Sequence, residues 1–232
     1  MFISTDAIVL KNTPYQETSI ISRLFTENSG KISVIFKGAK RNNNNLSGII
    51  ESGNVINITY YDKPNLKLSK EVKMIKIYYN SRKKLNHYYY TMAIISLIDK
   101  LCMDNETYIN LYNLSVSILD KMDDQLINIE LLFIYFLIHL NKHIGYEINI
   151  NKTILSKKVV DRDQEINVLK YFINSIDTLH MVDLKMVNKL DLLNRLKITI
   201  YRHMKHHVID LNEIYSINML KSINNERTSR PN

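Results

Sequence analysis

Residues 5–41 read TDAIVLKNTPYQETSIISRLFTENSGKISVIFKGAKR, and this stretch decides the fold. Ile32, Val34 and Phe36 recur with a period of two, which is typical of a β-strand with one buried face. The turn-forming run Asn28-Ser29-Gly30 separates that strand from the one before it. The segment therefore predicts short strands that end in a basic loop, Phe36-Lys37-Gly38-Ala39-Lys40-Arg41.

The same alternation continues beyond this segment and predicts five strands. Their expected bounds are 5–11, 18–28, 31–37, 52–61 and 66–78. Between Met74 and Ile75 the apolar residues change parity, which predicts a β-bulge that re-aims the last strand. Five short strands in about eighty residues favour an OB-fold barrel. An SH3-like barrel has a compatible strand count and stays open as an alternative.

After residue 80 the apolar residues recur at helical spacing, as in Leu85, Tyr88, Met92 and Ile95. Helices are expected over 81–105, 107–122, 128–144, 165–176, 184–205 and 210–223. The polar tail 224–232 is expected to fray. The predicted fold class is α+β, with an N-terminal OB-fold barrel domain, 1–80, followed by an all-helical domain, 81–232.

Composition narrows the class of protein. The formal net charge is +8, which favours polyanionic partners, although the abundance of Asn, Ile, Lys and Tyr is also what an AT-rich genome produces. The one cysteine, Cys102, lies in an apolar stretch and is expected in the core, as in a protein of the reducing cytoplasm. The most apolar run, 131–138, is too short to span a bilayer, and the N-terminus has no signal-peptide pattern. We expect a cytoplasmic protein without membrane contact.

Motifs for catalysis are missing from the sequence. Neither a GxxxxGK[ST] phosphate loop nor a GxGxxG fingerprint occurs. His203 and His207 share a helix face at metal-ligand spacing, but no HExxH motif accompanies them and basic residues surround them. Asp120, Asp123 and Asp124 read as solvated charges. The prediction is a protein that is not an enzyme and has no metal, cofactor or small-molecule substrate.

Basic residues on the predicted barrel suggest nucleic-acid binding. The expected DNA-binding residues there are Lys11, Arg23, Lys37, Lys40 and Arg41. Their cations would neutralise phosphates, Gly38 would let the backbone turn tightly, and exposed aromatics such as Tyr15 or Tyr61 could stack on bases. A solvated basic turn would have the same composition.

A second basic group lies on the helix expected over 184–205. Its predicted DNA-binding residues are Lys197, Arg202 and Lys205. The buried side of that helix is expected to comprise Ile198, Ile200, Tyr201 and Met204. A charged helix face is common without any ligand, so both interpretations stay open.

The order of these features resembles the RecO family of DNA repair proteins. The resemblance to the family's N-terminal barrel is carried by the opening strand 5–11, Tyr15-Gln16-Glu17-Thr18-Ser19, Leu24-Phe25-Thr26, Gly30-Lys31-Ile32-Ser33 and the basic loop ending at Arg41. It continues at Arg82-Lys83-Lys84-Leu85 and at Ile144-Gly145-Tyr146 in the helical part. A weaker likeness covers Tyr201-Arg202-His203-Met204 through Leu211 and Leu220.

The resemblance implies a recombination mediator active in DNA repair after DNA damage. Such proteins bind single- and double-stranded DNA, anneal complementary strands and, with RecR, help to load RecA on DNA coated by single-strand binding protein. The acidic C-terminal tail of the single-strand binding protein docks in their helical domain. It also implies a nucleoid-associated location.

Two departures from the family pattern are visible. Many members carry a four-cysteine zinc site after the Gly-Tyr step, whereas residues 147–152 here contain no cysteine, so a zinc-free variant is expected. Asparagines occupy 42–45, where the family's loop is usually more basic. This favours, as an alternative, a protein-interaction adaptor whose OB barrel has lost DNA binding. A third hypothesis, a hydrolase or nucleotidyl enzyme, lacks the constellation that it needs.

Overall fold

The computed structural model describes residues 1–41, 45–64, 66–149, 159–174 and 190–228. Contacts divide the chain into two compact units, residues 1–123 and 124–232. The strands of the first unit are β1 (Phe2–Tyr15), β2 (Ser19–Thr26), β3 (Gly30–Phe36), β4 (Val55–Tyr61) and β5 (Leu66–Lys76). Its helices are α1 (Leu46–Ile49), α2 (Tyr79–Lys83), α3 (Leu85–Leu101) and α4 (Ile109–Asp124), whose last residue falls in the second unit.

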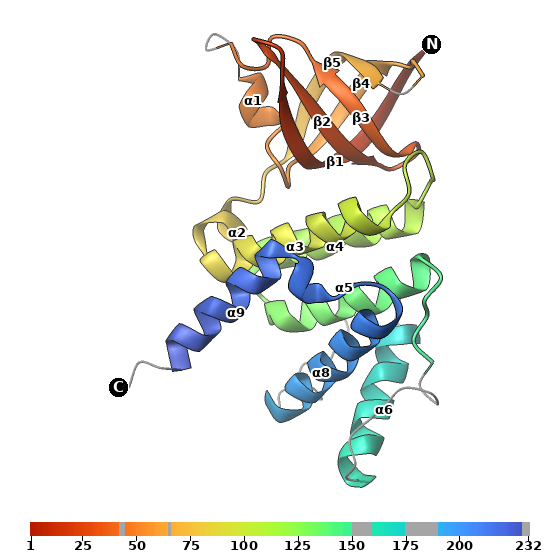
Figure 1. Cartoon of the computed structure of the whole chain (residues 1–232), viewed down its shortest axis with the longest axis vertical. Coiled ribbons are helices and arrows are strands. Elements are labelled where there is room, and N and C mark those ends of the chain that lie inside the picture. The colour runs from red at the N-terminus through yellow and green to blue at the C-terminus, as the bar shows by residue number, and fades with distance from the viewer. Residues whose placement is uncertain (42–44, 65, 150–158, 175–189, 229–232) are drawn as a thin grey trace. The chain divides into compact units, whose positions relative to one another are not determined.

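The strands close into a barrel in the order β1-β2-β3-β5-β4. Neighbouring strands are antiparallel except for β3 and β5, which run parallel. The short helix α1 lies in the connection between β3 and β4 (Figure 1). The barrel is therefore the predicted OB-fold rather than the SH3-like alternative.

Alternating side chains fill the barrel. The buried cluster consists of Ala7, Val9, Leu24, Ile32, Val34, Phe36, Ala39, Ile50, Ile56, Ile58 and Tyr60. Leu46 and Ile49 of α1 pack against this cluster from the side of the β3–β4 connection. The period of two that is visible in the sequence is thus the physical source of the core.

The predicted bulge in β5 is confirmed. Val55 pairs with Lys76 and Ile56 with Met74, so that Ile75 is the extra residue. Two further irregularities were not foreseen. β1 changes register between Val9 and Lys11, and β4 changes register against β5 between Thr59 and Tyr60. Each irregularity bends a strand, as closure of a small barrel requires.

The helix expected over 81–105 is interrupted. Lys84 has extended backbone angles (φ −109°, ψ 117°) and separates α2 from α3. α2 is held by other contacts, because the Ser81 N–H donates to Asp123 Oδ1 (2.8 Å) and the Arg82 guanidinium donates to Asn54 Oδ1 (2.6 Å). In Figure 1, α3 and α4 lie across one end of the barrel, and α3 contacts β1 and β2.

The second unit is built around α5 (Ile129–His143). Every residue from Leu131 to Asn141 in this helix is buried, and the Asn128 side chain caps its start by accepting from the N–H groups of Glu130 and Leu131. α5 packs against α6 (Val159–Asn174) and α8 (Leu190–His207).

The C-terminal elements differ partly from expectation. The 3₁₀ turn η2 (Leu211–Glu213) and α9 (Tyr215–Thr228) replace one continuous helix, and the predicted fraying from residue 224 is wrong up to Thr228. Residues 175–176 and 184–189 of two predicted helices lie outside the described residues. No helix in the described part of the chain combines the length and apolar character that crossing a membrane requires.

The predicted boundary at residue 80 lies between β5 and α2, where strands give way to helices. The compact units divide later, at residue 123, because α2, α3 and α4 group with the barrel. The assignment of residues 1–80 and 81–232 as separate domains stays a prediction.

Candidate nucleic-acid interface

Three of the predicted cations share the turn that follows β3. Lys37, Lys40 and Arg41 are all exposed there. Gly38 has φ +72°, and the Arg41 N–H donates to its carbonyl (3.0 Å), which closes the turn. The Lys40 Nζ donates to the carbonyl of Gln16 (2.8 Å) in the β1–β2 turn. This hydrogen bond joins the basic turn after β3 to the β1–β2 turn.

The exposed Tyr15, at the end of β1, lies next to the turn that receives Lys40. Residues 42–44, most of the predicted asparagine loop, lie outside the described residues. The turn consequently offers cations and one partly exposed aromatic ring, which are the side chains that single-stranded nucleic acid needs.

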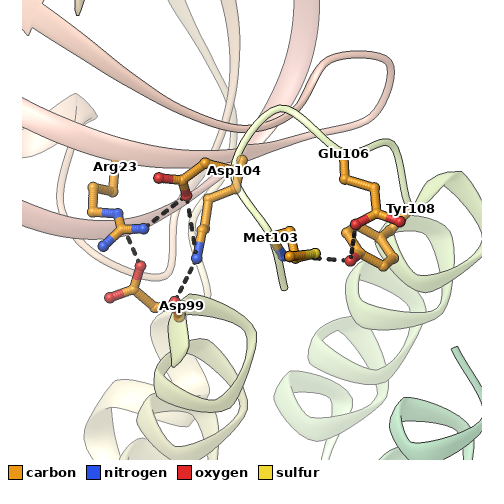
Figure 2. A network of polar contacts seen from close by, with 7 residues as sticks. Arg23, Asp99, Met103, Asp104, Glu106 and Tyr108 are labelled. Atoms are coloured by element: carbon orange, nitrogen blue, oxygen red, sulfur yellow. Dashed lines mark hydrogen bonds and ion pairs between the residues drawn. The ribbon is translucent and has the colours of Figure 1, made fainter. Parts of the chain in front are cut away.

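Arg23 has a different environment from the turn. It lies directly opposite Lys11 in the β1–β2 pair, but its guanidinium makes ion pairs with Asp99 (3.1 Å) and Asp104 (2.9 Å), as Figure 2 shows. Lys11 is exposed and has no carboxylate partner among the residues that the structure covers. Because two carboxylates already balance Arg23, the interface proposed below does not include it. Lys11 stays a predicted DNA-binding residue beside that interface.

Arg23 belongs to a polar network that joins β2 and β3 to the end of α3 and to the α3–α4 connection. Lys31 is only 4 % exposed, donates to the carbonyl of Asp99 (2.6 Å) and approaches Asp104 Oδ1 (3.4 Å). The Tyr108 hydroxyl donates to Glu106 (2.8 Å) and accepts from the Met103 N–H (3.3 Å) in the same connection (Figure 2). These contacts fix the barrel on its own helices.

The predicted cations of the second group line a groove of about 780 Å³ between α8, η2 and α9. Its charged lining comprises Lys197, Arg202, Lys205, Lys221 and Asp210. Lys197 pairs with Glu130 (3.3 Å) and Lys205 with Asp210 (2.9 Å). The hydrogen bond between Lys205 and Asp210 raises the pKa of the lysine and lowers the pKa of the aspartate. Arg202 is exposed and has no ion-pair partner within the described ranges.

One expectation for α8 is wrong. Ile200 and Met204 are buried as predicted, but Ile198 is 57 % exposed and lines the groove with Tyr201 and Leu211. Burial raises the pKa of Tyr201, so its hydroxyl stays protonated. Sequence periodicity could not identify Leu211 and Lys221 as groove residues, because they belong to η2 and α9 and reach the groove only through the tertiary fold. The lining of the groove thus combines apolar side chains with basic ones.

Two models of known protein families match most of this chain. The family model described as "Recombination protein O N terminal" matches residues 1–78, and the one described as "Recombination protein O C terminal" matches residues 82–164. Together the two matches cover the barrel, the end of α2, the helices α3 to α5 and the start of α6.

The chain belongs to the RecO family.

Individual relatives agree with this assignment. A protein named "DNA repair protein RecO" from Chlorobium limicola is 27 % identical over 172 residues, which is 73 % of this chain and 66 % of that protein. Its namesake from Chlorobium phaeobacteroides is 29 % identical over 162 residues, covering 69 % of this chain and 62 % of the relative. A third protein of that name, from Syntrophomonas wolfei, is 24 % identical over 161 residues, which is 69 % of this chain and 64 % of that protein. The chain thus matches less than two thirds of the length of these curated relatives.

The region that carries the zinc site in many RecO proteins is described here only to Asn149. Gly145 ends α5 with φ +85°, the exposed Tyr146 accepts a hydrogen bond at its carbonyl from His203 Nε2 (3.0 Å), and Ile148 is buried. Cys102, the one cysteine of the sequence, is buried in the first unit as predicted. A four-cysteine site cannot form from one thiol, so the zinc-free assignment stands as a prediction.

Other residues considered for chemistry have structural contacts in this RecO-family chain. The rings of His203 and His207 lie 4.7 Å apart, and within the described residues no group of three His, Cys, Asp or Glu side chains could hold a metal ion. Asp124 is exposed, as expected for a solvated charge, but Asp120 and Asp123 are only partly exposed and make specific contacts. Asp120 accepts from the Tyr78 hydroxyl (2.9 Å), and Asp123 accepts from the Ser81 N–H of α2 (2.8 Å).

Proposed function

We propose that this chain is a DNA-binding mediator of recombinational repair that performs no bond chemistry. The observation that carries the proposal is the exposed turn of Lys37, Lys40 and Arg41 on a closed OB barrel of the RecO family. Cations on such a turn neutralise phosphates and leave the bases accessible, so that complementary strands held on the same surface can pair.

In this proposal the chain binds single- and double-stranded DNA and anneals complementary strands. With RecR, it promotes loading of RecA on DNA coated by single-strand binding protein. It would work in the cytoplasm at the nucleoid. Support comes from the family membership and from the names of the relatives as DNA repair proteins.

The basic turn gives a testable salt dependence. If about five phosphates are neutralised, the logarithm of the affinity for oligo(dT) falls with the logarithm of the salt concentration at a slope of about −3.5. Lys37→Ala and Arg41→Ala should each flatten that slope by about 0.7, because each removes one phosphate contact. Fluorescence anisotropy of labelled oligo(dT) across a KCl series measures both slopes.

Lys83→Ala is the matched control, since Lys83 is also exposed but lies on α2. It should leave the slope unchanged. Wild-type slopes in both turn variants would place the DNA contacts elsewhere on the protein.

The groove of the second unit suits the acidic, apolar tail of single-strand binding protein. Its basic side chains would pair with carboxylates, while Ile198, Tyr201 and Leu211 would receive apolar side chains. We expect Arg202→Glu to weaken binding of a labelled tail peptide by at least about tenfold, because the reversed charge repels the peptide. Isothermal titration calorimetry measures the affinity.

Lys170→Glu is the control for this change, because Lys170 is exposed on α6 and does not line the groove. It introduces the same type of charge reversal in the same unit and should bind the peptide as the wild type does. Equal losses in the two variants would mean that net charge, rather than the groove, governs binding.

The adaptor hypothesis is favoured by one observation, the asparagines at 42–45 where charge is expected. It predicts partner binding without affinity for bare DNA. Annealing of complementary oligonucleotides precoated with single-strand binding protein, without ATP or added metal, separates the two functions. Acceleration by this chain supports the mediator, whereas tail binding without acceleration supports the adaptor.

A further inference from the structure

Two exposed aromatic rings meet where β1 begins and β4 ends. Phe2 and Tyr61 occupy directly opposite positions of this antiparallel pair, and their ring centroids lie 5.4 Å apart in an edge-to-face arrangement. Their side chains are 54 % and 40 % exposed, whereas the neighbouring Tyr60 is fully buried in the barrel core. The two outward rings contribute little to that core.

The pair is held firmly although Phe2 is close to the N-terminus. The pairing of β1 with β4 is continuous from Phe2 to Ile8, and the Asp62 N–H donates to the carbonyl of Met1 (2.9 Å) just beyond it. A ring on a fixed backbone loses little conformational freedom when a ligand binds. The site is therefore preorganised.

Two lysines add positive charge beside these rings. Lys70 Nζ lies 4.4 Å from the centroid of the Phe2 ring, and Lys63 Nζ lies 5.6 Å from that of Tyr61. Neither ammonium group has a carboxylate partner among the described residues. The other lysines of β5 are paired, namely Lys67 with Asp62, Lys73 with Glu71 and Lys76 with Asp120. The positive charge left uncompensated on this strand thus lies next to the aromatic rings.

The position of Lys70 depends on the second irregularity of the β4–β5 pair. Thr59 pairs with Glu71 and Tyr60 with Ser69, which leaves Lys70 as the extra residue. A bulge re-aims a side chain, and bulges are frequent beside binding sites. Here the bulged residue directs its ammonium group to the ring of Phe2.

We propose that Phe2, Tyr61, Lys63 and Lys70 form a second DNA contact, here called the aromatic platform, on which bases of single-stranded DNA stack. It rests on the DNA-binding function proposed above and adds stacking to the phosphate contacts of the basic turn. Any base can stack on an aromatic ring, and the adjacent lysines neutralise the phosphates. A duplex keeps its bases stacked inside, so the platform favours single strands.

The absence of tryptophan from the sequence permits a specific test. The Tyr61→Trp variant keeps an aromatic surface and introduces one fluorescent indole, whose emission is expected to be quenched saturably by oligo(dT). An oligomer of the same length without bases should not quench it. Tyr79→Trp is the matched control, because Tyr79 is 62 % exposed but lies on α2, and its emission should not change.

Affinity provides an independent readout. The double variant Phe2→Leu with Tyr61→Leu should bind labelled oligo(dT) about tenfold more weakly, the factor expected for the loss of one base stack. Its affinity for duplex DNA should match that of the wild type. Circular dichroism establishes that the variant is folded before the comparison.

The outcomes separate the platform from the function on which it rests. Wild-type binding of oligo(dT), together with unquenched emission from Tyr61→Trp and unchanged affinity of the leucine variant, overturns the platform alone. Failure of the wild type to bind any DNA overturns both proposals. Equal weakening of single-strand and duplex binding in the leucine variant also counts against the platform, because stacking would then not be the contact that was lost.

Discussion

Gly30→Ala should lower the free energy of unfolding by about 3–5 kcal/mol. Gly30 has φ +66°, a conformation that an alanine adopts only with strain. A Cβ at this position would also lie 2.1 Å from the carbonyl oxygen of Glu106 and 2.6 Å from its carbonyl carbon. Backbone atoms cannot move aside by changing a rotamer, so the whole α3–α4 connection would have to shift.

That shift would break other contacts of the same connection. The Asn105 N–H donates to the carbonyl of Lys31 (2.9 Å), and Asp104 pairs with both Arg23 and Lys31. The effect of Gly30→Ala should therefore extend to the contact between the barrel and its helices. Urea unfolding followed by circular dichroism measures the loss of stability.

Gly48→Ala is the control for this prediction. Gly48 lies in α1, and a Cβ added there meets no atom within 4 Å. Alanine is the better helix former, so this variant should be as stable as the wild type or slightly more stable. A Gly30→Ala protein as stable as the Gly48→Ala protein would contradict the close packing of β3 against the α3–α4 connection.

Stability should also fall by about 3 kcal/mol between pH 6.5 and pH 4 because of one buried histidine. His139 is 1 % exposed within α5, and its Nε2 donates to the carbonyl of Phe172 (2.9 Å) near the end of α6. Burial lowers the pKa of His139 to about 4 from an ordinary value of 6.5, and the nearby charges of His143 and Lys142 act in the same direction.

The direction of the pH effect follows from proton binding. As the pH falls below 6.5, His139 becomes protonated in the unfolded chain. In the folded chain the same imidazole stays neutral until the pH approaches about 4. The stabilisation is therefore complete above pH 6.5 and is lost progressively as the pH falls towards 4. Urea unfolding at several pH values in this window measures it.

His139→Gln removes the titration while keeping an amide donor for the Phe172 carbonyl. We expect this variant to be less stable than the wild type at pH 7 but to show a flatter dependence of stability on pH. His206→Gln, an exposed position on α8, should keep the wild-type dependence. If the three proteins lose stability in parallel, carboxylates rather than His139 cause the acid sensitivity.

The limits of sequence-based prediction can be located at particular residues. The alternation of Ile32, Val34 and Phe36 predicted a strand because a pleated backbone alternates its side chains whatever surrounds it. The bulge at Ile75 was visible for the same reason, since an extra residue changes the parity of the pattern. The break at Lys84 left no such mark, because contacts of Ser81 and Arg82 with residues distant in sequence hold α2.

The features of the candidate DNA site also differ in whether the sequence could predict them. Lys37, Lys40 and Arg41 are neighbours in the chain, so their joint presentation on one turn followed from sequence order. Other features of the site did not follow from sequence order. They are the pairing of Arg23 with Asp99 and Asp104, the exposure of Ile198 and the placement of Lys70 against Phe2. Each of these depends on which distant residue the fold brings within a few ångströms.

The sequence by itself determined a five-stranded barrel, a helical remainder and a resemblance to RecO proteins that the family comparison confirmed. These properties rest on local periodicity and on the order of short motifs, and both can be read from the order of residues alone. Only the tertiary structure decided which cations are free and which are neutralised, and where aromatic rings meet unpaired lysines. Electrostatic and stacking interactions act through space over a few ångströms, and folding alone determines which residues come that close.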